Sequence, residues 1–350
     1  MKRIEKTHLY QEIHEQPEVI RRLINNQQDV ISALVGKIKA LGIHHIFIAA
    51  RGSSDNAGRF AKYLMGAHNH LVISLATPSL FTIYKQPPDL NDSLVLGISQ
   101  SGRSPDIVSV LKEGQKQGAL TAAITNAPDS DLGKAAEFVI DLQAGEEVSL
   151  AATKTYTAQL TSLALFSTML KPEKGYQQDL NQLPDQLAEV FASESRITDL
   201  VERYRYMSHC VVIGRGFNYA SAFEFSLKMK ELTYTIAEPY SSADFLHGPV
   251  ALVDRGFPTF VIAPDGEMAP EMKALIGKVH QRDAEVIIFS NKNDLLGMSP
   301  HNVRLPGGVP EWLSPISAII PAQMFAMYLA KARGFDVDQP RGLRKITETW

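Results

Sequence analysis

The chain has 350 residues, of which 45% are hydrophobic and 21% are charged, proportions that are typical of a globular protein and exclude a disordered or fibrous one. At this length the size prior favours two domains. The formal net charge of −3 gives no reason to expect nucleic-acid binding, and the single cysteine excludes an internal disulfide and fits a reducing compartment.

Two segments bear on location. The amino terminus, Met1 to Gln11, is polar and lacks the apolar core of a signal peptide. The most apolar late stretch, residues 316–330, is interrupted by Ser317, Pro321 and Gln323. That stretch is too short and too polar to span a bilayer and predicts a buried helix. The sequence therefore predicts a cytoplasmic protein that neither enters a membrane nor binds nucleic acid.

Apolar runs of strand length alternate with helix-length segments along most of the chain, which predicts parallel α/β units. In the first half, the Gly52-Ser53-Ser54 turn leads into a helix from about Asp55, a second helix opens at Pro105, and a long helix lies beyond Ala152. The strands predicted in this half are 46–50, 93–98, 120–125 and 138–142.

The second half repeats this plan at a nearly constant offset. Residues 48–52 align with residues 212–216 at a shift of 164. The strands ending at Ile98 and Thr125 align, at a shift of 165, with apolar runs that end at Ala263 and Ser290. Three matched strand ends predict two tandem copies of one doubly wound parallel-sheet α/β domain, related by an internal repeat. We expect a helical amino-terminal segment over residues 1–30 and a first domain over residues 31–192. A second domain would follow over residues 193–335, and a carboxyl-terminal tail over residues 336–350.

The two copies differ in the loop after their second strand. The first copy has Ser-Gln-Ser-Gly-Arg-Ser at residues 99–104, and the second has Pro-Asp-Gly-Glu-Met-Ala at residues 264–269. Ligands of open α/β sheets bind at the carboxyl ends of strands, and a helix amino terminus favours phosphate. Three serine hydroxyls surround the helix start at Pro105, Gly102 allows close approach of the backbone, and Ser54 can converge on the same place. A capped helix after a polar loop is the alternative, but the asymmetry between the copies favours a phosphate pocket in the first.

Cofactor and metal motifs are missing. Residues 214–220 resemble a dinucleotide fingerprint, but the third small residue comes one place late and no acidic residue follows about 20 positions on. The ten histidines form no His-Glu-x-x-His pattern, and no cysteine pair exists. We therefore expect neither a cofactor nor a metal.

Several short motifs of the chain resemble those of a known family. The chain is similar to the isomerase half of the glutamine–fructose-6-phosphate amidotransferases, within the sugar-isomerase (SIS) family, over nearly its whole length from Tyr10 onward. The resemblance implies that the substrate is a sugar phosphate. The motifs that carry it are Ser99-Gln100-Ser101-Gly102, Leu150-Ala151-Ala152-Thr153-Lys154, Lys228-Met229-Lys230-Glu231, His247-Gly248-Pro249 and Asp338-Gln339-Pro340-Arg341.

Residue roles follow from that resemblance. Glu231 would move a proton between C1 and C2 with Lys228 close by, His247 would open the sugar ring from the neighbouring subunit of a homodimer, and Lys345 in the active-site tail would form an imine with the ketose. The residues expected to bind the substrate and its phosphate are Gly52, Ser54, Ser99, Gln100, Ser101, Ser104, Leu150 and Ala151.

The chain also departs from the family pattern. It begins almost where the isomerase half begins, without a glutaminase domain, so glutamine is not the expected ammonia source. Ser104 replaces the usual threonine, Arg103 stands where an acidic residue is common, and Arg344 replaces a small residue.

The candidate catalytic residues each have a plainer interpretation. Lys228 and Glu231 share a helix face and could form a surface ion pair, a loop histidine such as His247 is usually solvated, and Lys345 could belong to a basic end. A carboxylate in a partly apolar cleft nevertheless suits proton transfer between carbons. Our leading hypothesis is a deaminase that converts glucosamine 6-phosphate to fructose 6-phosphate and ammonia. The alternatives are another aldose–ketose phosphate isomerase, a fructosamine-phosphate deglycase and a non-catalytic sugar-phosphate sensor.

Overall fold

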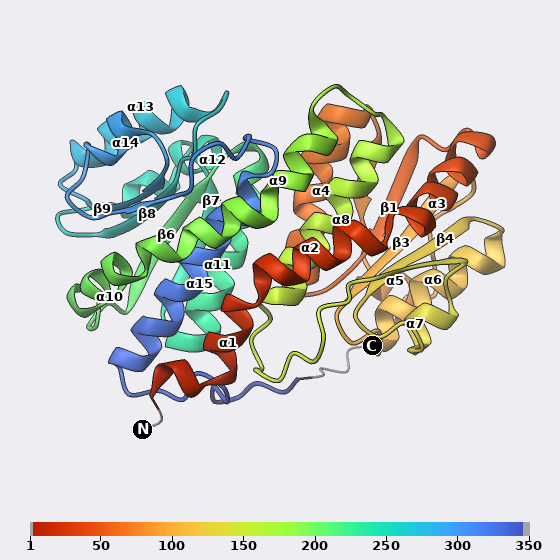
Figure 1. Ribbon diagram of the computed structural model, residues 1–350, viewed down its shortest axis with the longest axis horizontal. Coiled ribbons are helices and arrows are strands. Elements are labelled where there is room, and N and C mark those ends of the chain that lie inside the picture. Colours follow the sequence, from red (N-terminus) through yellow and green to blue (C-terminus); the bar gives the residue numbers. More distant parts are fainter. Residues whose placement is uncertain (1–2, 346–350) are drawn as a thin grey trace. The chain divides into compact units, whose positions relative to one another are not determined.

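The computed structural model describes residues 3–345, which form two compact units (Figure 1). What we call the first unit contains Glu18–Glu147, Lys154–Asn181 and the described residues from Arg344 on. What we call the second unit contains the described residues up to Pro17, together with Val148–Thr153 and Gln182–Leu343. Each unit is therefore assembled from separate stretches of sequence.

The first unit is built on a five-stranded parallel sheet in the order β2-β1-β3-β4-β5. Its strands are β1 (His45–Ala49), β2 (Val72–Leu75), β3 (Ser93–Ser99), β4 (Leu120–Thr125) and β5 (Phe138–Asp141). The helices lying mainly in this unit are α2 (Gln16–Asn26), α3 (Gln28–Leu41), α4 (Ser53–Asn69), α5 (Ser79–Thr82), α6 (Pro105–Gln117), α7 (Asp131–Lys134) and α8 (Lys154–Leu170). The predicted strands 46–50, 93–98, 120–125 and 138–142 are confirmed.

Helices cover both faces of this sheet, as a parallel sheet requires. Phe47, Val95 and Ala123 belong to a buried cluster with residues of α6 and α7. The alternate strand residues face the other side, where α4 and α8 pack together. Because β3 is buried along its whole length, its sequence is a continuous apolar run, which is why it could be predicted.

The second unit repeats this topology with the order β10-β9-β8-β6-β7, again parallel throughout. Its strands are β6 (His209–Gly214), β7 (Ile236–Ser241), β8 (Pro258–Ile262), β9 (Glu285–Ser290) and β10 (Asn302–Arg304). Its helices are α1 (His8–His14), α10 (Glu194–Arg203), α11 (Tyr219–Thr233), α12 (Ser242–Leu246), α13 (Ala269–His280), α14 (Asn293–Leu296) and α15 (Ser314–Ala332), and α9 (Tyr176–Glu189) leads into it. The predicted internal repeat of a doubly wound α/β domain is confirmed.

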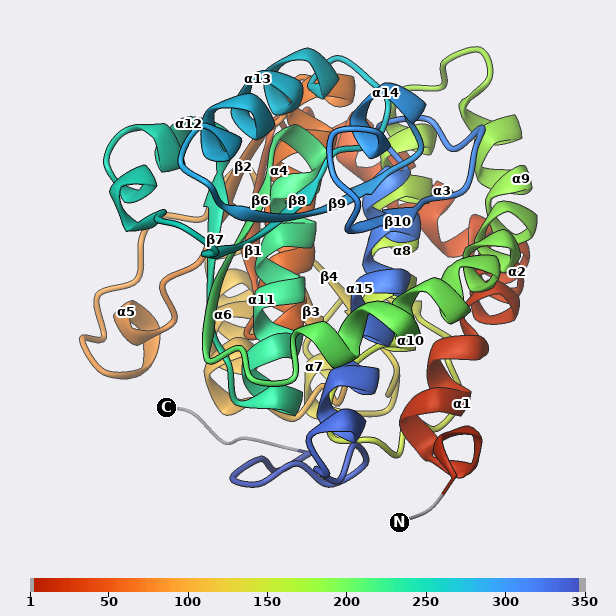
Figure 2. The same ribbon diagram turned by 90° about the vertical axis from the view of Figure 1, so that its left-hand side faces the viewer.

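The second unit also has a core on each face of its sheet (Figures 1 and 2). In both views α13 and α14 lie on one side of β8 and β9, and α11 and α15 lie on the other. On the α11 side, the rings of Phe225, Phe260, Phe289 and Phe325 pack with centroid distances from 5.1 to 6.0 Å. The predicted buried helix over 316–330 is α15. No helix within residues 3–345 has the length and apolar character needed to cross a membrane.

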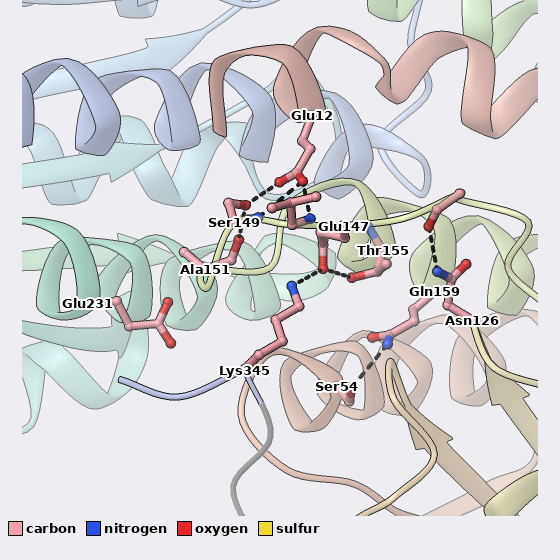
Figure 3. Close-up of polar contacts among 12 residues, drawn as sticks. Glu12, Ser54, Asn126, Glu147, Ser149, Ala151, Thr155, Gln159, Glu231 and Lys345 are labelled. Carbon is pink, nitrogen blue, oxygen red and sulfur yellow. Dashed lines mark hydrogen bonds and ion pairs between the residues drawn. The ribbon is translucent and has the colours of Figure 1, made fainter. Parts of the chain in front are cut away.

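The amino-terminal helix α1 is held in the second unit by a buried carboxylate (Figure 3). Glu12 accepts hydrogen bonds from the backbone N–H groups of Val148 and Ser149 and from the Ser149 hydroxyl. Nearby, the N–H of Leu9 donates to the Asp338 carboxylate at 2.9 Å. These bonds join three stretches that are far apart in sequence.

We expect Glu12→Ala to lower the free energy of unfolding by about 2–4 kcal/mol, because it leaves buried backbone donors without an acceptor. Urea denaturation measures this loss. The control is Glu18→Ala, which removes an exposed carboxylate from a surface ion pair with Arg21 and should cost less than about 1 kcal/mol. Equal stability of the two variants would contradict the anchoring role of Glu12.

Candidate functional site

The candidate phosphate residues of the first unit lie at the carboxyl ends of β1 and β3. These two strands are neighbours in the sheet, and the chain leaves them in opposite directions along the sheet order. Open α/β sheets bind ligands at such a switch point. Gly52 and Ser54 follow β1, and the loop Ser99–Ser104 follows β3. The fold therefore brings both candidate segments to one edge of the sheet.

The backbone of the Ser99–Ser104 loop is fixed by its own serines. The Ser99 hydroxyl accepts the N–H of Gly102 at 3.1 Å, and the Ser101 hydroxyl accepts the N–H of Arg103 at 3.4 Å. Gly102 has φ of +62°, and a Cβ there would lie 1.9 Å from the Ser130 hydroxyl. This position therefore requires glycine. The side chain of Gln100 is half-buried, and the backbone carbonyl of Gln100 accepts the N–H of Asn126 at 3.2 Å.

Ser104 precedes Pro105, the first residue of α6, as the sequence predicts. Its hydroxyl makes no capping hydrogen bond, so the amide groups of this helix start are not satisfied by it. Arg51 donates from Nε to the buried carboxylate of Asp106 in the first turn of α6, at 2.8 Å. About half of the Arg51 side chain is exposed. The loop is thus flanked by a cation and by a helix amino terminus, and both favour an anion.

Ser54 lies in the first turn of α4 and is buried. Its hydroxyl accepts a hydrogen bond from Nε2 of Gln159 on α8, at 3.0 Å (Figure 3). Gln159 is almost fully buried, and its Oε1 has no hydrogen-bond partner among the described residues. The sequence analysis missed Gln159, because a single glutamine within an apolar helix carries no signal of its partner.

Lys345 contacts a second buried carboxylate of the first unit (Figure 3). Its Nζ lies 3.3 Å from Oε2 of Glu147, whose side chain is fully buried. Glu147 also accepts the hydroxyl of Thr155 at 2.8 Å and the Thr155 N–H at 3.2 Å. A buried carboxylate needs such partners. The sequence analysis missed Glu147 and Thr155, although Thr155 directly follows the motif ending at Lys154.

In the second unit, Lys228 lies between two carboxylates of α11. Its Nζ is 2.5 Å from Oε2 of Glu231 and 3.4 Å from Oε1 of Glu224. The side chains of Lys228 and Glu224 have no exposed surface, and that of Glu231 is 20% exposed. The alternative of a surface ion pair is therefore wrong for Lys228. Sequence analysis missed Glu224, although its i, i+4 spacing to Lys228 was a usable signal.

The remaining candidates of the second unit lie in loops. His247 directly follows α12 and is exposed, and within residues 3–345 its ring makes no hydrogen bond or ion pair with Lys228 or Glu231. Leu150 is half-buried, while Ala151 is buried and its carbonyl accepts the Ser149 hydroxyl at 3.1 Å.

No group of three or more His, Cys, Asp or Glu side chains in the described part of the chain could hold a metal ion.

A model of the SIS domain family matches the chain twice, over residues 42–169 and 205–333. Among curated relatives, the isomerizing glutamine–fructose-6-phosphate aminotransferase of Gloeobacter violaceus is 35% identical over 96% of this chain and 58% of that protein. The corresponding protein of Escherichia coli is 31% identical over 98% of this chain and 59% of that protein. The chain thus spans less than two thirds of the length of these relatives.

Solved structures show the same similarity. The C-terminal domain of glucosamine-fructose-6-phosphate aminotransferase from Francisella tularensis superposes with a TM-score of 0.87 at 29% identity, covering 96% of this chain and 98% of that one. A glucosamine-6-phosphate deaminase from Thermotoga maritima has a TM-score of 0.79 at 20% identity, covering 98% and 100%, and shares the fold. With one family match on each of two repeated parallel sheets, the chain belongs to the SIS domain family.

Proposed function

We propose that this protein is a phosphosugar isomerase of the SIS type. The observation that carries the proposal is the serine loop Ser99–Ser104 at the switch point of the first sheet, where the start of α6 lacks a side-chain cap. The curated relatives are named for isomerising chemistry on fructose 6-phosphate. A six-carbon sugar phosphate is therefore the substrate class that fits.

The phosphate would be held by the loop and by its neighbours on β1. Hydroxyl groups and backbone N–H groups at a helix start bind phosphate without a full ion pair. Arg103, within the loop, adds positive charge on an exposed side chain, and Arg51 lies beside the loop in its ion pair with Asp106. The residues we assign to phosphate binding are Gly52, Ser54, Ser99, Gln100, Ser101 and Ser104. We assign Leu150 and Ala151 to the sugar.

Proton transfer is assigned to Glu231. A base that moves a proton between adjacent carbons must be close to the substrate but shielded from bulk water. The second condition is supported for Glu231, because its side chain is mostly buried and yet retains some exposure. Lys228, which has no exposed surface, would position the carboxylate and would not react itself.

The finer proposal is a deaminase. In open-chain glucosamine 6-phosphate, C1 is an aldehyde and C2 carries the amine. Glu231 would remove the proton from C2, and return of a proton to C1 would leave an imine at C2. The Lys345 amine would add to that imine and expel ammonia, which leaves an imine between Lys345 and C2. Water would then add to this second imine, which releases the Lys345 amine and leaves the ketone of fructose 6-phosphate.

Ring opening is assigned to His247. An imidazole can carry the proton from the ring hydroxyl to the ring oxygen near neutral pH. Because His247 is exposed and has no contact with Glu231 within its own unit, we propose that it serves the site of the other chain in a homodimer. Mixing Glu231→Gln and His247→Ala chains tests this, since only shared sites would restore activity in the mixture.

The first test is to mix purified protein with glucosamine 6-phosphate and to measure ammonia and fructose 6-phosphate in parallel. Both products should form in equal amounts, and Glu231→Gln should lower kcat about 10²- to 10⁴-fold, as expected for loss of a general base. Lys230→Gln, an exposed neighbour, is the matched control and should keep full activity.

The outcomes of this assay separate the alternatives. No ammonia from glucosamine 6-phosphate, together with an aldose phosphate formed from fructose 6-phosphate supplied alone, would indicate a plain aldose–ketose isomerase. Turnover of an amino-acid-linked sugar phosphate supplied as a further substrate would indicate a deglycase. Thermal stabilisation by the sugar phosphate without any turnover would indicate a sensor. Full activity of the Glu231→Gln variant would refute the role assigned to that residue.

A second prediction concerns the phosphate loop. Ser101→Ala should raise KM about 10- to 100-fold with little change in kcat, because one hydrogen bond to a charged phosphate is lost. Ser109→Ala removes a hydroxyl that is bonded within α6 and should leave KM unchanged. Steady-state kinetics of the two variants make the comparison, and an unchanged KM in Ser101→Ala would count against the loop.

A third prediction concerns the buried lysine. Lys228→Met should lower the free energy of unfolding by about 3–5 kcal/mol, because Glu224 loses a cation in a place without solvent. Lys230→Met disrupts only the exposed pair with Glu238 and should cost less than about 1 kcal/mol. Urea denaturation compares the two, and a similar small loss in both would show that Lys228 is dispensable.

A further inference from the structure

The loop Pro264–Ala269 of the second unit is equivalent to the loop Ser99–Ser104 of the first. It follows β8, which pairs with β6 as β3 pairs with β1. It also leads into a helix whose first turn contains a proline followed by an acidic residue, as in the first unit, and Pro105 and Pro270 are separated by the repeat shift of 165. The second unit thus has the same framework for an anion site.

An ion pair behind the loop is repeated as well. In the first unit Arg51 pairs with Asp106, with an N–O distance of 2.8 Å. In the second unit Arg215 pairs with Glu271, with an N–O distance of 3.5 Å. Both arginines follow the first strand of their sheet, and both acids lie in the first turn of the helix after the loop. This supporting contact has been kept while the loop sequence has changed.

The difference lies in what the loop amides bind. In the second unit, the carboxylate of Glu311 accepts the N–H of Glu267 through Oε2 at 2.8 Å and the N–H of Met268 through Oε1 at 3.2 Å. The equivalent amides of the first unit belong to Gly102 and Arg103, and they donate to serine hydroxyls. The same pair of N–H groups therefore has a charged partner in one unit and neutral partners in the other.

The second loop is also shaped around that carboxylate. Gly266 has φ of +151°, and a Cβ there would lie 2.3 Å from Cδ of Glu311. The backbone of Glu311 is held in turn, because its carbonyl accepts the Ser314 hydroxyl at 2.6 Å and that hydroxyl accepts Nδ2 of Asn218 at 2.7 Å. The Glu311 carboxylate is therefore held in place against the loop.

We propose that the second loop is an anion site whose resident anion is the Glu311 carboxylate, and that a phosphate monoester binds there only when this carboxylate is removed. The inference rests on the proposed function in taking the first loop as a phosphate site. A carboxylate on two N–H groups beside a helix amino terminus satisfies both the donors and the dipole. It also repels a second anion, so each chain retains one phosphate loop.

The test uses the full-length chain labelled with ¹⁵N and titrated with inorganic phosphate. In Glu311→Ala, the amide signals of Glu267 and Met268 should shift and saturate, with a Kd at least tenfold lower than any found for these amides in the wild-type chain. Glu267→Gln removes an exposed charge beside the loop and is the matched control. The Met268 amide of that variant should not respond to phosphate.

A second variant guards against a loop that loses its structure. Glu311→Gln keeps an oxygen acceptor for the two amides and removes the charge, and we expect the same signals to shift with weaker affinity. If phosphate shifts the Met268 amide in neither Glu311 variant, or does so equally in the wild-type chain, the proposal is overturned. The amides of Gly102 and Arg103 report the first loop separately, so failure there alone would refute the proposed phosphate site of the first unit.

Discussion

The start of a helix presents backbone N–H groups that have no partner within the helix, and each sheet of this protein places such a start at its switch point. In the first sheet this helix is α6, which follows β3 and its loop, and in the second sheet it is α13, which follows β8 and its loop. In the first unit the amides near that start donate to serine hydroxyls, and Ser104 supplies no cap. In the second unit they donate to a carboxylate. The same pair of loop N–H groups thus has neutral partners in the first unit and a charged partner in the second.

The buried charged side chains also have hydrogen-bond or ion-pair partners. Glu12, Glu147 and Lys228 are each removed from solvent, and each contacts two or more polar groups. Their desolvation would otherwise cost several kcal/mol. In two of these cases the partners come from distant stretches of sequence, so the charges also specify which stretches must meet. Lys228 is different, because both of its acidic partners, Glu224 and Glu231, lie on its own helix. Its ammonium group holds the Glu231 carboxylate in one direction.

Much of the fold could be predicted from sequence because it depends on burial. The central strands β3 and β4 are buried on both faces and appear as apolar runs, and the repeat made their assignment firmer. The edge strands β2 and β10 were not predicted because they are short and partly exposed. Strand β7 was not predicted because it is partly exposed and mixes polar with apolar residues. The loop residues of the candidate site follow from strand ends. Gln159 and Glu147 could not be found, because their partners lie 105 and 198 positions away and no periodicity connects them.

The composition of the second unit has a consequence for how the protein is made. Helix α1 is synthesised long before its partner, because the carboxylate that binds the Leu9 N–H belongs to Asp338, 329 positions later in the sequence. The N–H groups that bind Glu12 come from residues 148 and 149, which are synthesised much later than α1. Since domains generally fold as units during synthesis, α1 has to wait until Asp338 has been translated before it can dock completely. For that interval its apolar face, including Ile13, is available to chaperones, so the synthesis of Asp338 sets the earliest time at which this unit can be completed.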